Sequence, residues 1–164
     1  MDLLRQFGFA LAVFLAASFD TAMAGPWQAY NAPDYGFSML VPEGAQLETR
    51  EWPGGWGGLR GSYQGVTVLG VAKLGAHETA EAIEQFGANL TGIPRHAWEE
   101  FDAGADKGWD GYRAVRAELG ERIIFGGYGI GPKGSYLVLL ETTLADYAVH
   151  EDEYETWYES VRLY

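Results

Sequence analysis

The chain has 164 residues, a length that fits one globular domain, and its 23 acidic against 11 basic side chains give a net charge of −12. This charge repels the phosphates of nucleic acids and of anionic lipids, so neither is expected as a partner. The sequence contains no cysteine, which excludes disulfide bonds, thiolate metal sites, a cysteine nucleophile and a lipid-modified amino-terminal cysteine.

The first 24 residues have the composition of a secretory signal peptide. One basic side chain, Arg5, precedes the uncharged residues 7–19, and small residues then occupy Ala22 and Ala24, the two positions that a signal peptidase reads. A membrane anchor that stays uncleaved is the alternative, but a spanning helix needs about 20 apolar residues. We therefore expect a signal peptide over 1–24, a mature single domain over 25–164 without stable membrane insertion, and a periplasmic or secreted location.

The first half of this domain has the patterns of β-strands. After an extended lead-in over 25–33, aromatic and aliphatic residues alternate with smaller or more polar ones over 35–42, which predicts a half-buried strand. Two more strands are expected over 45–52 and 59–63, on either side of a Gly-rich segment. Residues 66–74 are apolar at both parities, and this predicts a central strand that is covered on both faces.

The hydrophobic period then changes to that of a helix. Apolar residues recur at helical spacing over 80–90, and Gly92 followed by Pro94 supplies a stop signal. A short second turn of helix is expected within 94–101.

The last third of the chain returns to strands and closes with a helix. Strands are expected over 112–119, 122–130 and 135–142, joined by hairpins. The final helix carries an apolar stripe formed by Tyr154, Trp157, Tyr158 and Val161. This order predicts an α+β fold, a mostly antiparallel sheet of about six to seven strands packed with two main helices as an α/β sandwich.

Two segments resemble a known family. Residues 35–42, Tyr-Gly-Phe-Ser-Met-Leu-Val-Pro, resemble the opening strand of the PsbP-like/Mog-like superfamily, and residues 154–163 are similar to its closing helix. The order of the elements between them is also similar, whereas the Gly-rich residues 54–58 depart from the pattern. The resemblance implies a PsbP-like fold and an exported accessory or binding domain, and it brings no catalytic residues.

Sequence motifs give little support to cofactor or metal chemistry. Gly129 to Gly134 match G-x-G-x-x-G, but a strand follows where the dinucleotide motif requires a helix, so a hairpin and no cofactor are expected. The histidines His77, His96 and His150 lack the spacing of metal ligands and are expected on the surface.

An aspartate series offers a weak calcium site. Asp102, Asp106 and Asp110 recur every four residues among glycines, and calcium prefers such oxygen ligands. Their spacing differs from that of an EF-hand loop, and Asp and Gly are also ordinary turn formers. Apart from this candidate we expect no metal.

The segment around Trp52 and Trp56 is the candidate binding element. Four glycines surround Trp56, and flat aromatic side chains on a Gly-rich tip can stack on a sugar or enter a groove of a partner. The alternative is that one or both Trp side chains fold back and seal the end of the sheet.

The leading functional hypothesis is a soluble, non-catalytic binding or accessory domain that acts on a protein, small-molecule or glycan partner in a bacterial periplasm. One alternative is a small secreted carbohydrate hydrolase that uses paired carboxylates, and another is an exported enzyme inhibitor with the Trp loop as its plug. A deep cleft with two inward-facing acids would favour the hydrolase, and an exposed aromatic patch would favour the binding domain.

Overall fold

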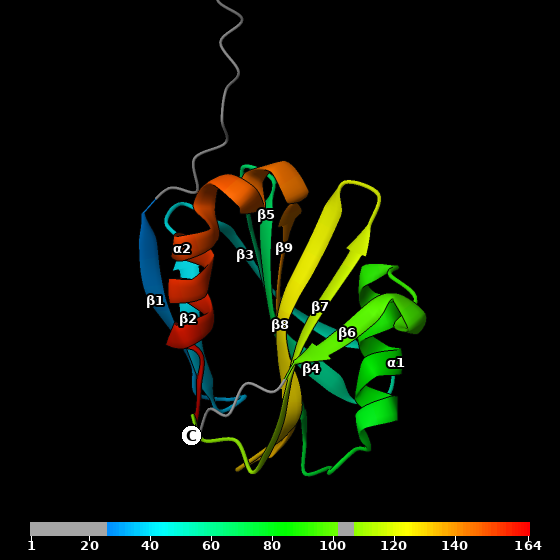
Figure 1. Cartoon of the computed structure of the whole chain (residues 1–164). Helices are drawn as coiled ribbons and strands as arrows, with labels where there is room; N and C mark the ends of the chain where they lie inside the picture. Colours follow the sequence, from blue (N-terminus) through cyan, green and yellow to red (C-terminus); the bar gives the residue numbers. More distant parts are fainter. Residues whose placement is uncertain (1–25, 102–106) are drawn as a thin grey trace, which may run out of the picture.

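Two antiparallel sheets and two main helices make up the part of the chain that the computed structural model describes, residues 26–101 and 107–164 (Figure 1). The predicted signal peptide and the candidate ligands Asp102 and Asp106 lie outside these residues. The larger sheet has seven strands in the spatial order β3 (Gln46–Trp52), β4 (Trp56–Tyr63), β5 (Val66–Leu74), β9 (Gly134–Thr143), β8 (Arg122–Gly131), β7 (Gly111–Leu119) and β6 (Trp98–Phe101). Each neighbouring pair is antiparallel.

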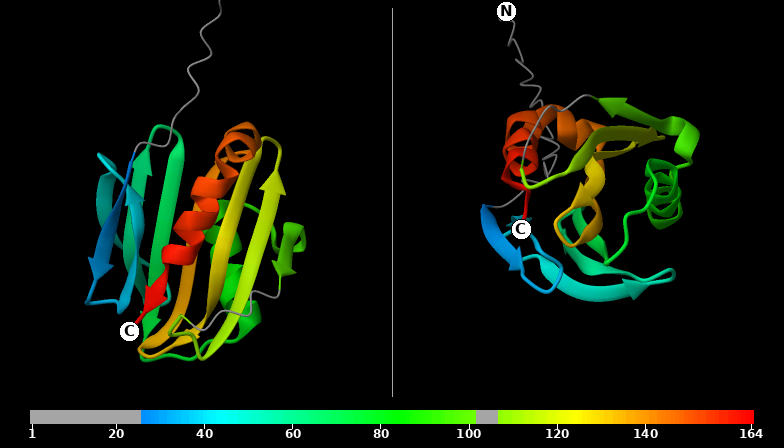
Figure 2. Two further views of the ribbon diagram at one scale, coloured as in Figure 1. Left: turned by 60° about the vertical axis from the view of Figure 1, so that its left-hand side comes forward. Right: turned by 90° about the horizontal axis from the view of Figure 1, so that it is seen from below.

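The smaller sheet and the helices lie on the faces of the large sheet (Figure 2). The small sheet has the order β1 (Trp27–Ala32), β2 (Phe37–Pro42) and β10 (Arg162–Leu163). Helix α1 (Ala80–Thr91) covers one face of the large sheet, while α2 (Leu144–Ser160) and the small sheet cover the other. The predicted α+β fold with a mostly antiparallel sheet is confirmed.

Short polar contacts fix where each helix begins. The hydroxyl of Thr79 accepts a hydrogen bond from the Ala82 amide at the start of α1 (3.1 Å), and Thr143 does the same for Asp146 at the start of α2 (3.1 Å). Helix α1 ends at Thr91. The amide of the next residue, Gly92, still donates to the Ala88 carbonyl (2.9 Å), and its left-handed backbone (φ 73°) turns the chain out of the helix, as the stop signal predicts.

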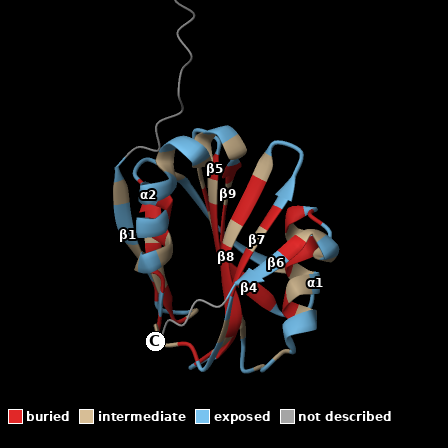
Figure 3. Cartoon of the chain, in the orientation of Figure 1, coloured by how far each residue is buried: buried red, intermediate tan, exposed pale blue. Residues whose placement is uncertain are grey.

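The core has two layers because the central strands bury both of their faces (Figure 3). In β5, Val66 and Val68 pack toward α2 and the small sheet, while Leu69 and Val71 pack toward α1. The prediction of a central strand over 66–74 is therefore confirmed. The G-x-G-x-x-G segment is also a hairpin, with Gly131 opposite Gly134 at the turn between β8 and β9.

Three local predictions differ from the structure. Most of the expected lead-in pairs with β2 as strand β1. The second helical turn is limited to a 3₁₀ turn over Arg95–Ala97, and strand β6 follows it. Helix α2 begins at Leu144, well before the predicted stripe, and bends at His150 (φ −117°, ψ 25°). In each case pairing or packing with a distant segment decides the conformation.

Neither helix in the described residues has the length and apolar character that crossing a lipid bilayer requires.

Candidate functional site

A groove runs between helix α2 and the outer strands of the large sheet. Helix α2 packs mainly on β2, β8 and β9 and reaches β7 through a few side chains, so β6 and part of β7 stay open on this face (Figure 1). The groove, here called the α2 groove, has a volume of about 400 Å³. Its lining residues are Phe101, Ala114, Val115, Arg116, Phe125, Gly126, Tyr147, Glu151, Tyr154, Glu155 and Tyr158.

Interlocked aromatic rings form the helix side of the α2 groove. Phe125 on β8 stands edge-on to Tyr147 (centroids 5.2 Å apart) and lies 5.7 Å from Tyr154, and the two tyrosines are stacked 6.0 Å apart. The hydroxyl of Tyr154 also donates a hydrogen bond to the carboxylate of Asp146, eight residues earlier in the same helix. Because each ring packs against the others, this wall is fixed before any ligand arrives.

One end of the groove is held by a contact between β7 and α2. The hydroxyl of Tyr112 hydrogen-bonds to that of Tyr158, and Trp109 packs on the Tyr112 ring at 4.7 Å. Tyr112 lies directly over Gly127, where a Cβ atom would collide with the ring. Glycine at this position therefore allows the sheet and the helix to be joined by the two tyrosines.

The charges along the groove are unevenly balanced. The Arg116 guanidinium lies 5.3 Å from the Tyr147 ring centroid and pairs with Glu118 at 2.6 Å, and this carboxylate raises the pKa of the guanidinium. Glu151 and Glu155 are exposed, and neither has an ion pair with any described residue. The net charge that the groove presents is therefore negative.

The tyrosine hydroxyls of the groove stay neutral. Burial raises the pKa of Tyr158 to about 12, and burial together with the nearby charge of Glu151 raises the pKa of Tyr147. These side chains can therefore donate hydrogen bonds at physiological pH, but they are unsuited to act as bases.

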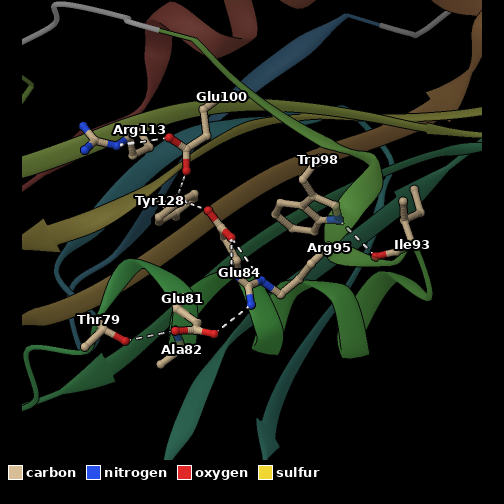
Figure 4. A network of polar contacts seen from close by, with 10 residues as sticks. All are labelled: Thr79, Glu81, Ala82, Glu84, Ile93, Arg95, Trp98, Glu100, Arg113 and Tyr128. Carbon is tan, nitrogen blue, oxygen red and sulfur yellow. Dashed lines mark hydrogen bonds and ion pairs between the residues drawn. The ribbon is translucent and has the colours of Figure 1, made fainter.

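The opposite face of the sheet carries a polar network (Figure 4). The hydroxyl of Tyr128 hydrogen-bonds to Glu84 on α1 and lies 2.8 Å from Glu100 Oε1 on β6. Arg95 donates from two nitrogens to Glu84 Oε2 (3.1 and 3.0 Å), and Arg113 approaches Glu100 at 3.4 Å. This network ties helix α1 to three strands of the sheet.

The pKa values in this network follow from its contacts. Burial raises the pKa of Tyr128, and its hydrogen bonds to the two carboxylates raise it further. Burial alone would raise the pKa of Glu84, but hydrogen bonds from Tyr128 and Arg95 outweigh it, and the net shift is downward.

Glu84 and Glu100 form a carboxylate pair of the kind that the hydrolase hypothesis requires, but both are engaged by the same tyrosine. The neighbouring hollow of about 190 Å³ is lined by Tyr128, Arg113 and Glu78, but neither Glu84 nor Glu100 lines it. Glu84 is also only 12% exposed and is held by Arg95. The arrangement serves to join α1 to the sheet.

The structure brings Trp52 and Trp56 together at the hairpin between β3 and β4. Trp56 is 5% exposed and stacks on Phe86 of α1 with centroids 4.4 Å apart and planes 6° apart, while the half-buried Trp52 stands edge-on to the same ring. The alternative in which these side chains fold back against the sheet matches this arrangement. Both still line a surface hollow of about 380 Å³ with Tyr35 and Leu74, and their role in partner binding or in an inhibitor plug stays a prediction.

The remaining candidates are dispersed. His77 and His96 are exposed as predicted, but His150 is half-buried and lies 3.1 Å from the Asp146 carboxylate, because the bend in α2 turns it toward the preceding turn. Asp110 is exposed, and no metal-binding group of three His, Asp or Glu side chains occurs within 26–101 and 107–164. Since Asp102 and Asp106 lie outside these ranges, calcium binding stays a prediction.

Comparison with known proteins supports the fold. No protein-family model and no curated protein sequence matches the chain. The solution structure of cyanobacterial PsbP (CyanoP) from Synechocystis sp. PCC 6803 is similar, with a TM-score of 0.54 over 92% of this chain and 99% of that chain, at 16% sequence identity. The chain has a PsbP-like fold. This confirms the fold that the sequence resemblance implied, whereas the likeness to Mog-like proteins stays a prediction.

Sequence reasoning missed the residues of the α2 groove in this PsbP-like fold. Its signal was present but ambiguous, because Phe125 and Tyr147 occur in segments whose aromatic residues equally fit a closed core. Only the position of α2, which packs mainly on β2, β8 and β9, leaves these rings next to an open surface.

Proposed function

We propose that this chain is an exported, non-catalytic binding or accessory domain and that the α2 groove is the surface that contacts its partner. The observation that carries the proposal is the groove itself, which combines a fixed aromatic wall with an exposed ring, Phe101 (47% exposed), on the opposite side. Exposed aromatic surface next to a pre-formed hollow is typical of sites that bind another molecule.

The α2 groove supports binding better than catalysis. Its ionisable groups are neutral tyrosines, a paired arginine and exposed glutamates, so it lacks the pair of inward-facing acids that glycoside hydrolysis requires. The PsbP-like fold is consistent with an accessory role.

Filling the groove tests this proposal. Ala114 lies on β7 in the floor of the groove and is small, so Ala114→Trp would occupy the space without changing charge. Affinity-tagged protein produced in its native cells should lose its specific partner when it carries Ala114→Trp, while Thr156→Trp on the exposed side of α2 should retain it. Retention of the partner by a folded Ala114→Trp variant would contradict the proposal.

Export is tested separately. The small residues Ala22 and Ala24 support cleavage before Gly25. Amino-terminal sequencing of protein recovered from the periplasm or medium should give a chain that starts at Gly25. A chain that still starts at Met1 in the membrane fraction would support the uncleaved anchor instead.

A further inference from the structure

We propose that the α2 groove recognises arginine side chains of a basic segment in the partner protein. This inference rests on the proposed function, since it specifies the chemistry of the molecule that enters the groove. It follows from the unpaired carboxylates of the groove, its aromatic rings and the cations that the chain already places on those rings.

Two carboxylates make the charge of the groove negative. Glu151 and Glu155 are one turn apart on α2, so their side chains lie on the same face of the helix, and both line the groove. Among the described residues that line the groove, Arg116 alone is basic, and it is already paired with Glu118. The net charge of −12 adds a long-range attraction for a basic partner.

Two tyrosines that line the groove already hold cations of this chain. The Arg116 guanidinium lies over Tyr147 (5.3 Å), and the Lys107 ammonium lies over Tyr158 (4.9 Å) while it pairs with Glu159 at 2.9 Å. A cation next to an aromatic ring and a carboxylate is therefore the arrangement that this surface forms within itself.

Between these two sites, α2 again places carboxylates close to aromatic rings, but no Lys or Arg side chain of the described residues lies there. Glu151 and Glu155 fall between Tyr147 and Tyr158 in α2, and the half-exposed ring of Phe101 lines the same groove. A guanidinium suits this stretch better than an ammonium, because its flat face stacks on a ring while its edge donates to a carboxylate.

The shape of the groove favours an extended segment. Its volume of about 400 Å³ is enough for one or two long side chains, and it is open to solvent rather than enclosed. A peptide can therefore lie along α2 and insert its arginines.

The test uses a fluorescein-labelled twelve-residue peptide with three arginines separated by Gly-Ser pairs. Fluorescence anisotropy should detect binding, and neutralising the groove with Glu151→Gln/Glu155→Gln should raise Kd about tenfold or more. The matched control Glu43→Gln/Glu51→Gln removes the same charge at exposed positions next to β2 and on the edge strand β3, neither of which lines the groove, and should raise Kd less than about threefold. A peptide with lysine in place of arginine should bind the unaltered protein several-fold more weakly.

Three outcomes would overturn the inference: no binding of the arginine peptide, equal weakening by the two double variants, or equal affinity for lysine. Backbone-amide NMR shifts that map away from α2, β6 and β7 would also overturn it. The natural partner separates this inference from the proposed function. If Ala114→Trp abolishes partner binding but Glu151→Gln/Glu155→Gln does not, the groove is the binding site and the arginine inference alone is wrong.

Discussion

The two faces of the large sheet are built differently, and the four residues of β6 show the contrast most directly. Trp98 points to the α1 face, where it is buried, hydrogen-bonds to the Ile93 carbonyl (3.0 Å) and lies so close to Gly87 of α1 that any side chain there would collide with it. Phe101, at the other end of the strand, lines the open α2 groove and is 47% exposed.

The difference follows from how each helix covers its face. Helix α1 closes one face together with the 3₁₀ turn and the Glu84 network (Figure 4). Its Phe86 ring also packs against Trp56, which is stacked on it, and Trp52, which stands edge-on to it. Helix α2 shares the other face with the small sheet and reaches β7 only through side chains such as Tyr158, which contacts Tyr112. Because an exposed aromatic ring contributes little to stability, the open face fits the binding role proposed above, whereas the contacts of the closed face contribute mainly to stability.

The largest expected effect lies where α2 itself is buried. Trp157 is fully buried, donates its Nε1 hydrogen to the Leu40 carbonyl (3.0 Å) and stands perpendicular to Phe125. Trp157→Ala should therefore lower the free energy of unfolding by about 3–5 kcal/mol. Urea denaturation measures this, with Glu153→Ala on the exposed side of α2 as a control that should change it by less than about 0.5 kcal/mol. An unchanged midpoint for Trp157→Ala would show that α2 is not part of the core.

The tryptophans of the β3–β4 hairpin test whether the α1 face is closed in solution. Trp56 stacks on Phe86 and is almost fully buried, so Trp56→Ala should lower the free energy of unfolding by about 3 kcal/mol. Trp52 is half-buried, so Trp52→Ala should lower it by about 1 kcal/mol. Melting curves of both variants provide the measurement. If Trp56→Ala leaves stability unchanged and weakens partner binding instead, the hairpin is the binding element and the comparison of the two faces is reversed.

The sequence predicts those parts of the fold that depend on neighbouring residues. The stop at Gly92 and the turn between Gly131 and Gly134 follow from local spacing, and both are present. Tyr154 and Trp157 of the predicted stripe are buried in α2, but the helix ends at Ser160, so Val161 lies beyond it in extended backbone. The doubly buried strand β5 was also predictable, because its residues are apolar at both parities.

Long-range contacts account for what the sequence did not predict. Strand β6 has one buried residue in four and exists through its pairing with β7, so no period marks it. The first turns of α2 likewise show little helical periodicity of apolar residues. The candidate groove depends on contacts such as Tyr112 with Tyr158, which are 46 residues apart, and local spacing carries no information about such a pair.

The polar network of the closed face should contribute stability in a pH-dependent way. Glu84→Gln removes a nearly buried charge that Arg95 and Tyr128 contact, so it should cost about 1–3 kcal/mol at pH 7. The folded-state pKa of Glu84 is lowered from its usual 4.5, so this contribution is present above pH 4.5 and is lost as the pH falls through the folded pKa. Urea denaturation of both proteins between pH 7 and pH 3 should show the difference shrinking with acidification. A difference that is constant with pH would exclude the charge of Glu84 as its cause.

The smallest effect on stability is expected at the open face. Strand β6 allows the two faces to be compared directly, because it places one aromatic ring on each of them. Phe101→Ser and Trp98→Ser remove one aromatic ring each from β6, but Phe101 is half-exposed in the α2 groove and Trp98 is sealed under α1. Phe101→Ser should change the free energy of unfolding by about 0.5 kcal/mol or less and still weaken binding of the arginine peptide several-fold. Trp98→Ser should do the opposite, with a loss of about 3 kcal/mol or more and little change in the affinity of the protein that remains folded. Denaturation curves and peptide anisotropy on the same samples measure both quantities. If the two variants lose stability equally, the α2 face is closed in solution, and the groove cannot be the site at which a partner binds.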